Sequence, residues 1–121
     1  MDTLSRIMLV AFVTLVSLRP VLAQGTSDPV RIIVVGAHPD ECDIKGGGTA
    51  ALLASMNHAV EFVAVPNGDA GHQTMKGKEL ARCRLAEAQE AGKRFGVAYD
   101  VLDNHDGQLL PDLSTRLQIV R

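Results

Sequence analysis

Aromatic residues are scarce in this sequence, which has no tryptophan, one tyrosine and three phenylalanines among 121 residues. Proteins that bind single-stranded nucleic acids commonly stack the bases on aromatic side chains, and this chain offers few. Its formal net charge of −2 at pH 7 provides no excess of positive charge for a phosphate backbone or an anionic membrane surface. We therefore expect no nucleic acid among its partners.

Cysteine is also rare, with only Cys42 and Cys83 present. A disulfide between them would suit an exported protein, but it needs a geometry that sequence does not specify. Two unpaired, partly buried thiols are the interpretation we favour. Neither thiol has a recognisable partner base, as a cysteine nucleophile would require.

The apolar run at residues 7–18 is too short to span a membrane, because a spanning helix needs about 20 residues. Arg6 precedes this run and small or modest residues follow it at 21–23, which is typical of a secretory signal peptide at residues 1–23. We predict cleavage before Gln24, a secreted or periplasmic protein, and no stable membrane insertion afterwards. Removing the signal peptide leaves 10 basic and 13 acidic residues, a net charge of about −3.

Strand-like and helix-like segments alternate after a short polar linker at residues 24–29. The β-branched run at 31–35 is typical of a strand buried on both faces of a parallel sheet. The segment 78–95 has helical periodicity and ends before Gly96, where a left-handed cap costs little. The predicted elements are strands at 31–35, 60–65 and 99–102, loops at 36–48, 66–77 and 103–112, and helices at 49–56, 78–95 and 113–121.

This alternation predicts an α/β fold with a parallel, doubly wound sheet and flanking helices. Ligands of such sheets bind outside the carboxyl ends of the strands, and all three polar loops follow strands. Three strands make a thin sheet, and the last helix has no stop signal before Arg121. We therefore expect a truncated domain whose ligand site lies where the loops meet.

The first loop holds His38, Asp40 and Glu41 directly after a predicted strand. Imidazole and carboxylate groups are ligands that zinc accepts, and a carboxylate left free of the metal can accept a proton from water. Alternatively, Asp40 caps a turn while His38 packs, or the acids hold magnesium or calcium. The glycines at 46–48 could also cradle a phosphate in a nucleotide-binding domain, although they match no dinucleotide or Walker motif.

The arrangement of motifs resembles the LmbE-like (PIG-L) family of de-N-acetylases. The family signature is a strand followed by Ala-His-Pro-Asp-Asp and then Gly-Gly-Thr at the start of a helix. The matching segments in this chain are Val35-Gly36-Ala37-His38-Pro39-Asp40-Glu41, Gly47-Gly48-Thr49-Ala50, Asn67-Gly68-Asp69-Ala70-Gly71, Arg84-x-x-Glu87 with a later Gly96, and Asp106-Gly107-x-Leu109. They occur in the family order over nearly all of residues 30–121.

This resemblance implies a Rossmann-like fold and a zinc-dependent hydrolase that removes acetyl or similar acyl groups from an amide nitrogen. The implied substrate is a small N-acetylated amino sugar or glycoconjugate of the N-acetylglucosamine type. His38 would be a zinc ligand, Asp40 the general base, and Glu41 would stand at the second ligand position. Residues 30–121 would form the N-terminal part of the deacetylase domain.

Three further residues are candidates for substrate binding. The resemblance implies that Arg84 and Asp106 lie near the sugar or hold the loops that do, although a buried ion pair and a turn would also explain them. His72 stands in a loop on the same predicted edge, where it would either contact substrate or be an ordinary polar loop residue.

Two departures from the family pattern bear on activity. The family usually has aspartate where this chain has Glu41, and its third zinc ligand belongs to a later His-x-x-His-like motif that does not occur by Arg121. We therefore expect residues 1–121 alone to bind zinc weakly and to be poorly active or inactive. The alternative function is an inactive carbohydrate-binding or structural module of the same fold.

Overall fold

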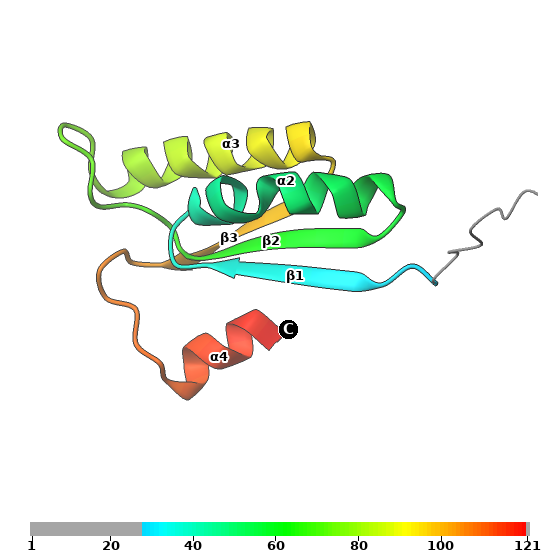
Figure 1. Ribbon diagram of the computed structural model, residues 1–121. Coiled ribbons are helices and arrows are strands. Elements are labelled where there is room, and N and C mark those ends of the chain that lie inside the picture. The colour runs from blue at the N-terminus through cyan, green and yellow to red at the C-terminus, as the bar shows by residue number, and fades with distance from the viewer. Residues whose placement is uncertain (1–27, 121) are drawn as a thin grey trace, which may run out of the picture.

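A computed structural model describes residues 28–120 of the chain (Figure 1). The predicted signal peptide at 1–23 and most of the predicted linker at 24–29 lie outside the described residues. The elements in chain order are β1 (Arg31–Gly36), α2 (Glu41–Ser55), β2 (Ala59–Pro66), α3 (Gly77–Phe95), β3 (Ala98–Asn104) and α4 (Leu113–Val120).

The three strands form one parallel sheet in the order β1-β2-β3. In this register Val34 of β1 lies opposite Phe62 of β2, and Phe62 lies opposite Tyr99 of β3. Helices α2 and α3 cover one face of the sheet, and α4 lies on the opposite side (Figure 1). The predicted α/β fold with a parallel sheet and flanking helices is confirmed.

The core lies between β2 and the two helices α2 and α3. Its largest fully buried side chains are Phe62, Leu80 and Cys42. The ring of Phe62 makes edge-on contacts with Tyr99 and Phe95, with centroids 5.2 and 6.4 Å apart. Aromatic pairs favour this arrangement, so these contacts join β2 to both β3 and α3.

The prediction that β1 is buried on both faces is wrong. Alternate side chains of a strand point to opposite faces, and Ile32 and Val34 pack against the core. Ile33 and Val35 point the other way and are 51% and 46% exposed. The cause is that α2 and α3 both lie on the same face of the sheet, while α4 on the other face packs against β2.

The predicted start of the first helix is also wrong, because α2 begins at Glu41 and not at Thr49. The glycines at 46–48 lie inside this helix rather than in a loop. Gly47 is buried, and a Cβ there would lie 2.6 Å from Cζ of Phe95, so this glycine lets α2 approach α3 closely. Only the first four N–H groups of a helix are free, so these glycines have no free N–H groups with which to cradle a phosphate.

The two cysteines are free thiols, one buried and one partly exposed on α3, as the sequence predicted. Burial raises the pKa of the Cys42 thiol, whose Sγ donates a hydrogen bond to the carbonyl of Val34. None of the helices within residues 28–120 has the length and apolar character needed to cross a membrane.

Candidate active site

The loops that follow β1, β2 and β3 meet at the carboxyl edge of the sheet, as the alternating pattern predicted. A pocket of about 180 Å³ lies there. Its lining comes from all three loops and from α3, and consists of His38, Pro39, Asp40, Gly68, Ala70, Gly71, Arg84 and Asp106. Four of the predicted site residues, His38, Asp40, Arg84 and Asp106, are thus brought together.

Side-chain hydrogen bonds hold the turn between β1 and α2. The Ala37 N–H donates to Oε2 of Glu41 at 2.8 Å, so the first side chain of α2 reaches back over the turn. The buried Tyr99 hydroxyl donates to the Pro39 carbonyl at 2.7 Å, and burial strongly raises the pKa of this hydroxyl. Tyr99 was missed by sequence reasoning, because no local pattern on β3 links it to a turn 60 residues away.

Asp40 is the N-cap residue of α2, but its carboxylate makes no capping hydrogen bond within the described part of the chain. The structure therefore contradicts the alternative in which the Asp40 side chain caps the turn. The residue is exposed and lines the pocket. Its carboxylate is consequently available to a molecule in that pocket.

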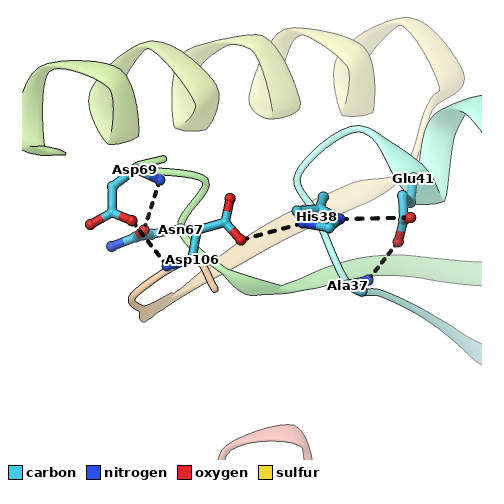
Figure 2. A network of polar contacts seen from close by, with 6 residues as sticks. All are labelled: Ala37, His38, Glu41, Asn67, Asp69 and Asp106. Atoms are coloured by element: carbon cyan, nitrogen blue, oxygen red, sulfur yellow. Dashed lines mark hydrogen bonds and ion pairs between the residues drawn. The ribbon is translucent and has the colours of Figure 1, made fainter. Parts of the chain in front are cut away.

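His38 lies between two carboxylates, as Figure 2 shows. Its Nδ1 is 3.7 Å from Oε1 of Glu41, and its Nε2 is 3.3 Å from Oδ1 of Asp106. The His38 side chain is 51% exposed, whereas that of Asp106 is 13% exposed. The two ring nitrogens therefore face different partners on opposite edges of the imidazole.

Asp69 joins the second loop to the third. Its Oδ1 accepts the backbone N–H of Asp106 at 3.0 Å (Figure 2), and its Oδ2 pairs with Nδ1 of His105. The hydrogen bond from the Asp106 N–H, followed by that from His105, lowers the pKa of the Asp69 carboxyl. Sequence reasoning placed Asp69 in a family motif but did not predict its contact with His105, because that contact joins two separate loops.

Gly68 and Arg84 shape the pocket wall. Gly68 has a φ of +68°, and a Cβ there would lie 3.0 Å from Pro39 and 3.1 Å from Arg84. A residue without a side chain therefore lets the second loop pack between the first loop and α3. The Arg84 guanidinium donates to Oε2 of Glu87 at 2.9 Å on the same helix.

His72 is not among the pocket-lining residues. Its Nδ1 accepts the backbone N–H groups of Thr74 and Met75, at 3.2 and 3.0 Å. The imidazole thus closes a turn within its own loop. The structure does not bring His72 together with the other five predicted site residues.

The capacity of this site for a metal is partial. Two ligands of a tetrahedral zinc lie about 3.4 Å apart when each bond is about 2.05 Å, and Nδ1 of His38 and Oε1 of Glu41 are 3.7 Å apart. That pair fits a shared ion. Across residues 28–120, however, no group of three His, Cys, Asp or Glu side chains is close enough to hold one.

Comparisons with known proteins give a consistent family match. Residues 33–120 match the family described as GlcNAc-PI de-N-acetylase (PIG-L). Over 97 residues the chain is 30% identical to a diacetylchitobiose deacetylase of Thermococcus kodakarensis. The aligned region covers 78% of this chain and 36% of that relative.

Solved structures share the fold. N,N'-diacetylchitobiose deacetylase from Pyrococcus horikoshii superposes with a TM-score of 0.68 at 28% identity, covering 98% of this chain and 45% of that one. The 4-carboxy-2-hydroxymuconate hydratase from Pseudomonas putida gives 0.66 at 24% identity, covering 77% and 42%, a likeness that shows the fold alone. The chain spans less than half the length of each of these relatives.

Proposed function

Because this chain belongs to the GlcNAc-PI de-N-acetylase (PIG-L) family, we propose that it is part of a metal-dependent hydrolase. The reaction is removal of an acetyl group from the amide nitrogen of an N-acetylglucosamine-type substrate. Two relatives are named for deacetylation of diacetylchitobiose, a sugar of this type. The proposed metal is zinc.

The observation that carries this proposal is the placement of three groups on one turn. His38 and Glu41 lie within reach of one ion, while the intervening Asp40 keeps its carboxylate free and borders the pocket. Amide hydrolysis at a metal needs separate groups for these two roles, because the carboxylate that accepts the proton must not also bind the metal. The bound metal would polarise the amide carbonyl and acidify water.

In this proposal Asp40 moves the proton. Its carboxylate accepts a proton from the water that attacks the amide carbon, and the proton is then delivered to the departing nitrogen. The C–N bond breaks, leaving a free amine and acetic acid, which releases its remaining proton to become acetate. Arg84 and Asp106 border the same pocket, where they would contact the sugar hydroxyls or hold the loops that do, whereas the turn made by His72 favours an ordinary loop role for it.

Replacing Asp40 with asparagine tests this role. Acetate release from N,N'-diacetylchitobiose is measured with excess zinc and a high concentration of the chain, because only two ligands are expected to hold the ion. We expect slow release by the unaltered chain, and a loss of at least about 100-fold in the variant, the usual contribution of a general base. Zinc binding stays unchanged, because Asp40 is not a ligand.

Asp100→Asn is the matched control, since Asp100 is an exposed carboxylate on β3 that does not line the pocket. It should leave acetate release unaltered. Retained release by Asp40→Asn, or loss of its zinc, would contradict the role of Asp40.

An inactive sugar-binding module is the second candidate function. The observation that favours it is that Glu41 uses one oxygen to bind the Ala37 N–H, and that residues 28–120 bring together no third ligand. Saturable binding of the sugar without any acetate release would support this candidate over the hydrolase.

A further inference from the structure

We propose that Asp106 is a positioning residue that sets the orientation of His38. This inference rests on the proposed function, in which His38 binds a metal ion. The Asp106 carboxylate lies beside Nε2 of His38 and favours the proton on that nitrogen, which leaves the lone pair of Nδ1 directed toward Glu41. This differs from a direct contact with the sugar, the role that the family resemblance implies for Asp106.

The argument begins with the chemistry of imidazole. A neutral ring carries one N–H, and the other nitrogen has the lone pair that binds a metal. The nitrogen that carries the proton is chosen by its hydrogen-bond partner, and metal-binding histidines commonly donate their second N–H to a carboxylate or carbonyl.

The geometry of His38 satisfies this requirement at both edges of the ring. Nε2 lies 3.3 Å from Oδ1 of Asp106, an ion-pair contact that favours a proton on this nitrogen. Nδ1 lies 3.7 Å from Oε1 of Glu41, too far for a strong hydrogen bond and near the spacing of two ligands of one ion. Figure 2 shows the imidazole between the two carboxylates.

Asp106 is itself held in place, as a positioning residue must be. Its backbone N–H donates to Oδ1 of Asp69, whose other oxygen pairs with His105. The Asp69 carboxylate and the Asp106 side chain are each 13% exposed, compared with 51% for His38. The more enclosed carboxylate therefore orients the more exposed ring, and the second loop fixes the third.

The primary test is the tautomer of His38 in the metal-free chain. Nitrogen-15 NMR distinguishes a protonated from an unprotonated ring nitrogen, and spectra are recorded at increasing pH until they no longer change, so that the ring is neutral. We expect the Nε2–H form to dominate in the unaltered chain. Asp106→Ala should shift the two nitrogens toward a mixture of tautomers.

Two further variants make the result specific. Asp106→Asn retains an oxygen acceptor and should restore the Nε2–H form. Asp100→Asn removes a carboxylate that does not line the pocket and should change nothing at His38. The alanine variant keeps the backbone N–H that binds Asp69, so the third loop retains its anchor.

Zinc affinity provides the second readout. Asp106→Ala should weaken zinc binding by about 10–100-fold, the usual effect of losing a carboxylate behind a metal-binding histidine. An unchanged tautomer together with unchanged affinity would overturn the proposal and leave Asp106 to the substrate. If the unaltered chain takes up no zinc, the proposed function fails, whereas the tautomer of the metal-free chain still decides the role of Asp106.

Discussion

Glu41 has two contacts, one with each carboxylate oxygen. Oε2 accepts the Ala37 N–H at 2.8 Å, and Oε1 lies 3.7 Å from Nδ1 of His38. The aspartate usual in the family is one methylene shorter and would reach less far back over the turn. The length of Glu41 therefore explains how this chain can hold the turn with the same side chain that faces the proposed metal.

Two replacements of Glu41 separate its contacts. Glu41→Ala should destabilise the metal-free chain by about 1 kcal/mol, because the Ala37 N–H loses its acceptor. Glu41→Gln keeps a carbonyl oxygen for that N–H and should cost clearly less, while both variants lose zinc affinity because the carboxylate is gone. Urea unfolding of the metal-free variants measures the difference. An equal loss of stability in the two variants would show that the hydrogen bond is not what Glu41 contributes.

At the residue scale, the sequence predicted those site residues that lie next to one another along the chain. His38, Asp40 and Glu41 could be recognised because imidazole and carboxylates stand side by side after a strand. The contact between His38 and Asp106, and the bond from Tyr99 to Pro39, depend on how three strands align in the sheet. No local pattern encodes that alignment, so these partners became visible only in the fold.

The elements show the same division between local signals and packing. Helix α3 was predicted to within one residue, and Gly96 ends it in the left-handed conformation, with φ of 72°. Both features rest on local signals, namely helical periodicity and a terminal glycine. The start of helix α2 was predicted eight residues too late, because glycine has a low intrinsic helix propensity and the packing of Gly47 against Phe95 is a tertiary contact.

Adjacent glycines of α2 test this account of the helix. Gly47→Ala should destabilise the protein by about 1 kcal/mol or more, because a Cβ would lie 2.6 Å from the Phe95 ring and overpacking outweighs the gain in helix propensity. Gly48→Ala should stabilise it by roughly 0.5–1 kcal/mol, since a Cβ there meets nothing within 4 Å and alanine favours helix. Thermal unfolding compares the two. Destabilisation by Gly48→Ala would indicate that the segment is not an ordinary helix.

For the whole molecule, the main consequence is an uneven sheet. One face is covered by α2 and α3 and contains the core, while the other carries α4 and leaves Ile33 and Val35 half exposed on β1 (Figure 1). The sequence predicted burial on both faces, because a continuous apolar run fits a covered strand. The apolar run shows that both faces of β1 are hydrophobic. It does not show whether another element of residues 28–120 covers each face.

Neighbouring isoleucines on β1 distinguish the two faces. Ile32→Thr should cost about 1–3 kcal/mol, because it places a hydroxyl beside the core cluster that Ile32 contacts. Ile33→Thr should change the free energy of unfolding by less than about 0.5 kcal/mol, because Ile33 is 51% exposed. The same variant should reduce the binding of a hydrophobic dye to the folded chain, since it removes apolar surface from an open face. Equal costs at the two positions would mean that both faces of β1 are covered in solution.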